Sequence, residues 1–110
     1  MFYTSGNQRE LVSFGEYVYE TRELKIIYDS HVSFNRKALV IQHKFGEKEM
    51  YLISYNTIVC SYSPVKGFAR YWGGYSATTM RHINEFRKQL GYPAMSKKAW
   101  DDLPVKKWEE

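Results

Sequence analysis

A chain of 110 residues, of which 44% are hydrophobic and 25% charged, has the length and composition of one globular domain with a modest core. The single cysteine, Cys60, excludes an internal disulfide, and the longest uncharged stretch, residues 50–65, is too short and polar to span a bilayer. The first ten residues lack the basic and apolar regions of a secretory signal. We therefore expect a soluble, cytoplasmic protein.

The net charge of +4 is confined to the second half of the chain. Residues 1–55 contain seven basic and seven acidic residues, whereas residues 56–110 contain nine basic and five acidic ones. This asymmetry favours an acidic partner, either nucleic acid or an acidic protein surface. A surplus of a few charges also serves solubility alone, and this alternative stays open.

The first part of the chain shows weak patterning followed by strand signals. Residues 1–14 have little periodicity, and we expect them to be weakly ordered. Alternating tyrosines and β-branched residues predict strand structure from Gly15 to Ser33. "KALVIQHKF" and "EMYLISY" predict two strands joined by a hairpin at Gly46, and a tight turn at Asn56-Thr57 leads into "IVCSYS". "FARYW" predicts a last edge strand, which gives a mostly antiparallel sheet of four to six strands.

The hydrophobic period changes after Tyr75, where an amphipathic helix is predicted over residues 77–90. Ser76 is placed to cap its start, and Gly91 to end it. Its apolar face consists of Met80, Ile83, Phe86 and Leu90. Since neither a sheet nor a helix can bury its apolar side alone, the chain is predicted to be a single α+β domain of residues 1–110, with this helix covering one face of the sheet.

A second, short helix is predicted over residues 97–103, with a serine at its N-cap and a proline after its end. Lys97 and Lys98 occupy its positive first turn, and Asp101 and Asp102 its negative end, so both pairs oppose the helix dipole. Such a conflict is found where lysines face an anion or an acidic partner. The alternative is simple pairing of each lysine with the aspartate four residues later.

The connection between sheet and first helix, "WGGYSATTMRH", is a candidate anion site. Gly73 and Gly74 allow successive backbone N–H groups to point one way, and the start of a helix leaves further N–H groups unpaired. Thr78 adds a hydroxyl and Arg81 a positive charge one turn in. The alternative is structural, with the glycines turning the chain and Ser76 capping the helix. Neither a P-loop nor a dinucleotide-binding spacing is present.

Aromatic residues lie on both sides of Arg70 in "FARYWGGY", a mixture that is used for stacking on single-stranded bases but also supplies the core of small β domains. Trp108 either fixes the C-terminal tail to the body of the protein or frays with it. The predicted binding surface collects residues from all these segments: Arg70, Tyr71, Trp72, Gly73, Gly74, Ser76, Thr78, Arg81, Lys88, Lys97 and Lys98.

Catalytic patterns are weak throughout the sequence. His31, His43 and His82 have no metal-ligand spacing, and Cys60 lies within a strand, as a small buried hydrophobe does. The carboxylates are scattered, and no pair is positioned for acid–base work. We predict a non-enzymatic protein without a metal or cofactor.

"SYNTIVCSYS", "YWGGYSATTMRHINEF" and "MSKKAWDDLP" resemble a family of short uncharacterised proteins of phages, plasmids and other mobile elements of Gram-positive bacteria. The resemblance covers residues 51–104 and transfers no catalytic residue. By analogy it implies a binding protein of a bacterial host cell that inhibits or modulates a host or defence machine, as anti-CRISPR proteins do. Because the chain is basic, it is not expected to act as a mimic of DNA. Its target would be an acidic protein surface or a nucleoprotein.

Two further hypotheses come from the residues alone. A small basic nucleic-acid-binding module would contact phosphates through Arg70, Arg81, Lys88, Lys97 and Lys98. A homo-oligomer would pair an aromatic face or a strand edge with a second copy of the chain. No association with a membrane is expected.

Overall fold

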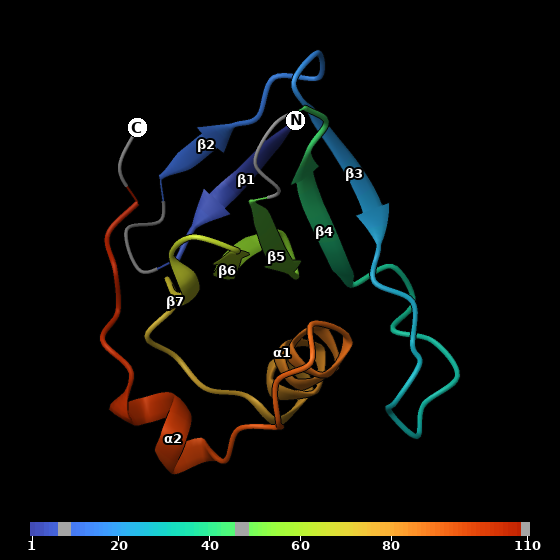
Figure 1. The fold of residues 1–110 in the computed structure, drawn as a ribbon, viewed down its shortest axis with the longest axis vertical. Coiled ribbons are helices and arrows are strands. Elements are labelled where there is room, and N and C mark those ends of the chain that lie inside the picture. Colours follow the sequence, from blue (N-terminus) through green and yellow to red (C-terminus); the bar gives the residue numbers. More distant parts are fainter. Residues whose placement is uncertain (7–9, 46–48, 109–110) are drawn as a thin grey trace.

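The computed structural model of the chain describes residues 1–6, 10–45 and 49–108. The described residues form one mixed sheet with two helices (Figure 1). The strands are β1 (Phe2–Ser5), β2 (Leu11–Ser13), β3 (Tyr19–Glu23), β4 (Ala38–His43), β5 (Met50–Ser54), β6 (Thr57–Ser63) and β7 (Gly67–Arg70). The helices are α1 (Ala77–Gln89) and α2 (Lys97–Asp102). The predicted α+β class is therefore confirmed.

The strand order is β2-β1-β6-β5-β4-β3, with β7 also paired to β6. β5 pairs with one edge of β6. The other edge of β6 is shared, because β1 pairs with it near Thr57 and β7 pairs with it from Cys60 onward. The β1–β6 pair is parallel, and the remaining pairs are antiparallel. The prediction of a mostly antiparallel sheet of four to six strands is confirmed only in part, because the sheet is mixed and residues 1–14 add two strands, β1 and β2, where little regular structure was expected.

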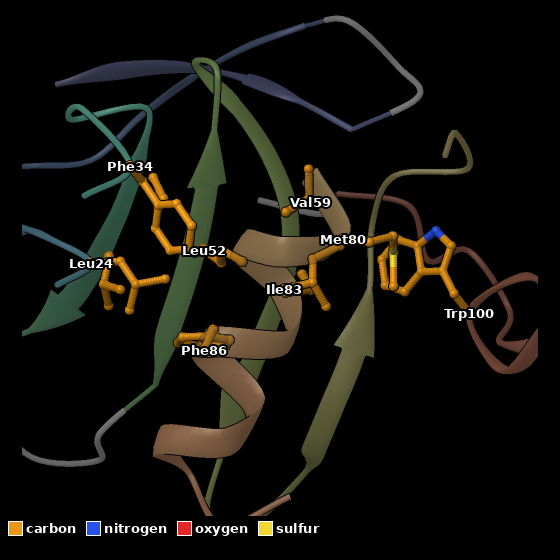
Figure 2. Close-up of a cluster of buried hydrophobic side chains, with 11 residues drawn as sticks. Leu24, Phe34, Leu52, Val59, Met80, Ile83, Phe86 and Trp100 are labelled. Carbon is orange, nitrogen blue, oxygen red and sulfur yellow. The ribbon is translucent and has the colours of Figure 1, made fainter. Parts of the chain in front are cut away.

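The sheet curls as a half-barrel, and α1 lies inside the curl (Figure 1). The apolar face of α1 predicted from the sequence packs there, with Met80, Ile83 and Phe86 against the strand residues Leu52 and Val59 (Figure 2). Residues buried in this first cluster are Leu24, Phe34, Ala38, Val40, Leu52, Val59, Cys60, Met80, Ile83, Phe86 and Trp100. Burial of this apolar surface is the main stabilising contribution to the fold.

A second cluster covers the opposite face of the sheet. Its buried members are Val12, Phe14, Ile41, Tyr51, Ile53 and Ile58. Trp108 packs against it, with its ring centroid 5.2 Å from that of Tyr51 and 5.6 Å from that of Phe14. The C-terminal segment is therefore fixed to the body of the protein, as Figure 1 shows by its course from α2 past β7 toward β2. This settles the alternative left open for Trp108.

Both predicted helices and their caps are confirmed. The Ser76 hydroxyl accepts a hydrogen bond from the Thr79 N–H at 3.0 Å, and the Ser96 hydroxyl accepts one from Ala99 at 3.1 Å. Gly91 has a φ of +89°, the left-handed conformation that ends many helices. The turn between β5 and β6 lies one residue earlier than predicted, because Tyr55 and Asn56 adopt φ values of +49° and +66°, as a two-residue hairpin requires.

The strand predicted from Gly15 to Ser33 is mostly wrong, because only Tyr19–Glu23 is extended and residues 24–37 form a loop. The Glu85 side chain of α1 explains this difference. Its carboxylate accepts hydrogen bonds from the backbone N–H groups of Ile27, Tyr28 and Asp29 at 3.2, 2.9 and 2.7 Å. These donors would otherwise pair with a neighbouring strand.

Two remaining expectations concern the hairpin tip between β4 and β5 and the possibility of a membrane-spanning segment. The hairpin tip predicted at Gly46 lies outside the described residues, although the strands that flank it, β4 and β5, pair as expected. Among the residues that the structure describes, neither helix has the length and apolar character needed to cross a membrane.

Candidate functional site

A groove lies on the face of the sheet opposite α1, the face that carries the second cluster, and small side chains form its floor. Ser61 of β6 pairs with Ala69 of β7, and Ser63 pairs with Gly67. Side chains on a strand alternate between the two faces, so these four residues share one face while Tyr62 and Phe68 point to the first cluster. The small residues leave this part of the sheet uncovered and create the hollow.

Larger aromatic and basic side chains surround this floor. The aromatic side consists of Tyr51, Tyr71 and Trp108, and the ring centroids of Tyr71 and Trp108 lie 5.5 Å apart. Lys66 comes from the turn between β6 and β7, whereas Lys106 and Lys107 come from the C-terminal segment. The groove has a volume of about 550 Å³, which is within the range of small-molecule and cofactor sites.

The C-terminal lysines reach the groove through a main-chain pairing. Val105 forms a parallel bridge with Arg70, and the Lys106 N–H donates a hydrogen bond of 2.8 Å to the Arg70 carbonyl. This contact continues the sheet beyond β7 and aligns Lys106 and Lys107 with the edge of the floor. Strand pairing therefore brings Lys66 and these two lysines, which are far apart in the sequence, to the same groove.

Three lysines and one carboxylate are found among the described residues that line the groove, so this lining is positively charged. In the described part of the chain, no carboxylate lies within ion-pair distance of Lys66, Lys106 or Lys107. Glu49 lines the groove and accepts a hydrogen bond from Tyr51. Burial, together with this carboxylate, raises the pKa of the Tyr51 hydroxyl, so the phenol stays neutral. The groove is thus suited to an anionic ligand with an apolar or aromatic part.

Arg70, predicted as a surface contact, is instead a core residue with 4% of its surface exposed. Its guanidinium donates hydrogen bonds to the carbonyl oxygens of Trp72 (2.8 Å), Trp100 (2.7 Å) and Leu103 (3.1 Å), and it stacks over the Trp100 ring. Burial lowers the pKa of Arg70 from its ordinary value. The cation serves the carbonyl-rich end of α2, where a positive charge is favourable, and it is not available to a phosphate.

The glycine-rich connection between β7 and α1 has a structural role. Trp72 packs against the first cluster, and the Gly74 carbonyl accepts a hydrogen bond from the Trp100 indole at 2.9 Å. A Cβ at Gly74 would overlap the Trp72 indole, so a glycine is needed there. Gly73 is exposed, and Ser76 is the N-cap. Of the predicted aromatic residues in this stretch, Tyr71 is the one that lines the groove.

Arg81 and Thr78 lie at the start of α1, beside a second hollow of about 450 Å³ on a different part of the surface. The Arg81 guanidinium lies 3.6 Å from the Asp29 carboxylate, which also contacts the His31 ring at 3.0 Å. Hydrogen bonds from His31 and the charge of Arg81 hold the pKa of Asp29 below its usual value, despite partial burial. Arg81 therefore has an acidic partner, and it does not join the groove lysines.

The other predicted lysines also lie apart from the groove. Lys97 and Lys98 form ion pairs with Asp101 (2.6 Å) and Asp102 (3.0 Å), which is the local pairing considered as the alternative. Lys88 is exposed on α1. The predicted basic surface is thus dispersed, because its members face in different directions or are already paired.

The residues with the greatest catalytic potential are buried in structural contacts. His82 is 1% exposed, and its Nδ1 lies 2.8 Å from the hydroxyl of Ser54, which in turn lies 3.0 Å from that of Thr79. Burial lowers the pKa of His82 to about 4, so the imidazole is neutral at pH 7. Cys60 is fully buried, and burial raises the pKa of its thiol. No group of three metal-ligating side chains occurs in the described ranges.

Most of the groove consists of residues that were not predicted as binding residues from the sequence: Tyr51, Ser61, Ser63, Lys66, Lys106, Lys107 and Trp108. A signal for its floor was present in "CSYSPVKGFAR", where small residues alternate with large ones on both sides of a turn. Alternation of this kind indicates a strand with one uncovered face. Nothing local, however, links the lysines of the C-terminal segment to this hairpin.

The fold and the groove define a small α+β domain with a half-barrel sheet and a basic, aromatic-lined surface hollow. The chain belongs to a family of unknown function, DUF8033, whose model matches residues 22–102. A comparison with curated proteins and one with solved structures each find no match. The family match includes the groove floor and both helices, and it ends before Lys106 and Lys107.

Proposed function

We propose that this chain is a small, non-enzymatic binding protein that acts by occupying an acidic protein or ribonucleoprotein surface. The observation that carries the proposal is the groove, where three lysines without a carboxylate in ion-pair distance among the described residues surround an aromatic-lined hollow. Charge of one sign around a concave surface attracts a partner of the opposite sign and speeds its association.

The structural use of the reactive side chains supports a role in binding rather than catalysis. His82 is enclosed with Ser54 and Thr79, and Glu85 is saturated by backbone donors of the loop 24–37. A general base has to reach a substrate proton, and a nucleophile has to reach an electrophile. Neither of these groups is exposed enough to do so.

The partner we propose is a host or defence machine of a bacterial cell, with an inhibitory or modulating effect like that of anti-CRISPR proteins. This rests on the resemblance of residues 51–104 to proteins of mobile elements and on analogy with small proteins that block larger assemblies. A basic groove fits an acidic face of such an assembly, or its bound nucleic acid.

Affinity capture from host lysate tests the proposal with two variants of equal charge. The groove variant is Lys66→Gln/Lys106→Gln/Lys107→Gln, and the control is Lys25→Gln/Lys88→Gln/Lys98→Gln, whose lysines are exposed outside the groove. We expect the wild type and the control to retain one defined assembly, and the groove variant to lose it. Equal retention by all three proteins would refute the role of the groove.

A second candidate function is a small nucleic-acid-binding module that needs no protein partner. It is favoured by the same groove, because lysines beside aromatic rings are the usual elements of single-strand binding. Nuclease treatment of the lysate separates an assembly held through protein, which survives it, from one held through nucleic acid, and binding of the purified chain to protein-free strands tests whether nucleic acid alone is enough. Light scattering of the purified protein tests the homo-oligomer, for which β3, the last strand in the order of the described sheet, offers an edge.

A further inference from the structure

We infer that the groove binds single-stranded nucleic acid, with its lysines at successive phosphates and one base against the wall formed by Tyr71 and Trp108. The inference deepens the proposed function and rests on it, because it names the part of a ribonucleoprotein that would enter the groove. It concerns a site that shares only Tyr71 with the surface predicted from the sequence.

The positions of the charges favour an extended anion. Lys66 lies in the turn at one end of the β6–β7 hairpin, while Lys106 and Lys107 follow the bridge between Val105 and Arg70 at the other end of β7. Positive charges at both ends of a floor suit a chain with repeated negative groups better than one compact anion. Among the described residues that line the groove, Glu49 is held by Tyr51, and three lysines against this one carboxylate give a net positive charge.

The aromatic wall favours nucleic acid over an acidic peptide. Aspartate and glutamate side chains would use the lysines alone, whereas a nucleobase also offers a flat face to an aromatic ring. Trp108 is half-buried and lines the groove. It also packs against aromatic rings of the second cluster. Its position is therefore fixed before a base arrives, which lowers the entropic cost of stacking.

The shape of the groove favours a single strand over a duplex. Its floor of serine, alanine and glycine lies on the sheet, and its rim is formed by lysines and by the C-terminal segment. In a duplex the faces of the bases are stacked on one another, so no base face is available to an aromatic side chain of the groove. In a single strand a base can turn toward Trp108 while the neighbouring phosphates stay at the rim.

Fluorescence anisotropy of labelled ten-nucleotide RNA and DNA strands, at two salt concentrations, tests this inference on the purified full chain. We expect single strands to bind more tightly than a duplex of the same length. Neutralising all three groove lysines should weaken binding at least tenfold and reduce the salt slope by about 2, since each phosphate contact on a single strand contributes about 0.7. The Lys25→Gln/Lys88→Gln/Lys98→Gln control should weaken binding less than about threefold.

Tryptophan fluorescence gives a second measure that charge alone would not change. Trp108 lines the groove, Trp100 is fully buried and Trp72 packs against the first cluster. We expect a bound strand to quench the wild-type emission and to leave the emission of Trp108→Phe unchanged, with circular dichroism verifying that this variant is folded. The phenylalanine keeps an aromatic contact in the second cluster while removing the indole.

Three outcomes would overturn the inference. Polyglutamate of matched length could bind as tightly as the strands, the duplex could bind more tightly, or no strand could bind at low salt. In each case the affinity capture still decides the proposed function, because groove-dependent retention of a nuclease-resistant assembly would show an acidic protein partner. If the capture fails while single strands bind, the second candidate function replaces the first.

Discussion

His82 is a titratable residue that the fold holds in its neutral form. It lies between the Ser54 hydroxyl and the ring of Phe34, whose centroid is 4.5 Å from that of the imidazole. Burial lowers the pKa of His82 from 6.5 to about 4, and the nearby Asp29 only partly opposes this effect. Protonation of His82 is therefore easier in the unfolded chain than in the folded one.

We predict that the free energy of unfolding decreases as the pH falls from about 6.5 toward 4, because the unfolded state binds the His82 proton first. The full effect is of the order of 3 kcal/mol, from a shift of this size at 1.36 kcal/mol per unit. Urea unfolding at pH 7 and pH 5 measures the part that is lost by pH 5, about 2 kcal/mol. His82→Asn, which keeps a polar atom near Ser54, should flatten the dependence; an unchanged slope would assign it to other groups.

Arg70 illustrates the opposite case, a permanent cation placed in the core to satisfy carbonyl groups. Arg70→Met should lower the free energy of unfolding by about 2–4 kcal/mol, because three carbonyl oxygens in buried or partly buried contacts lose a charged donor. Lys88→Met, a matched change of an exposed cation, should stay within about 0.5 kcal/mol. Chemical denaturation of both variants gives the comparison, and equal effects would contradict the core role of Arg70.

At the scale of elements, α1 determines the shape of the loop that precedes β4. The Glu85 carboxylate accepts three backbone donors of this loop and one from Gln89, which also donates to the Lys25 carbonyl. Burial alone would raise the pKa of Glu85, but these hydrogen bonds outweigh it and lower the pKa. The ionised form is therefore the one that holds the loop.

We predict that Glu85→Gln releases the loop while α1 remains folded. The amide lacks the charge and has one oxygen in place of two, so stability should fall by about 2 kcal/mol. Hydrogen exchange should accelerate at the Ile27, Tyr28 and Asp29 amides and stay unchanged at the Leu52 amide in β5. Uniform acceleration over the whole chain would mean that the clamp is not local.

Sequence reasoning succeeded where the determining contacts are local. Ser76 and Gly91 delimit α1 through bonds within one turn, and the apolar runs between turn residues indicate the strands β4–β7. It failed where the partner is distant: β1 pairs with β6, and Glu85 binds a loop far earlier in the chain. For the groove, composition indicated basic and aromatic residues in the second half, but Arg70 was assigned to the surface because nothing in the sequence shows its three carbonyl partners.

At the scale of the whole molecule, Trp108 joins the C-terminal segment to the second cluster. It contacts the rings of Phe14, Tyr51 and Tyr71, which come from three separate parts of the sheet face. The groove, the second cluster and the C-terminal segment thus depend on one another. Loss of this contact would remove one wall of the groove and a part of the core together.

We predict that Trp108→Ala lowers the free energy of unfolding by about 2 kcal/mol, less than for a fully buried tryptophan, because the side chain is half-buried. The segment after Pro104 should become sensitive to proteases, while α1 stays protected. Trp108→Phe should retain most of the stability. Limited proteolysis followed by mass spectrometry locates the cleavage, and a first cut within α1 would contradict this prediction.

The shared edge of β6 has a consequence for how fast the chain folds. β5, β6 and β7 are joined by short turns and can pair early, whereas β1 has to find Thr57 and Ile58 across the whole β2–β5 region. Closing so long a loop costs entropy before any contact compensates it. We expect β1 to dock last, so that substitutions at Ser5 accelerate unfolding and leave the refolding rate in stopped-flow experiments nearly unchanged.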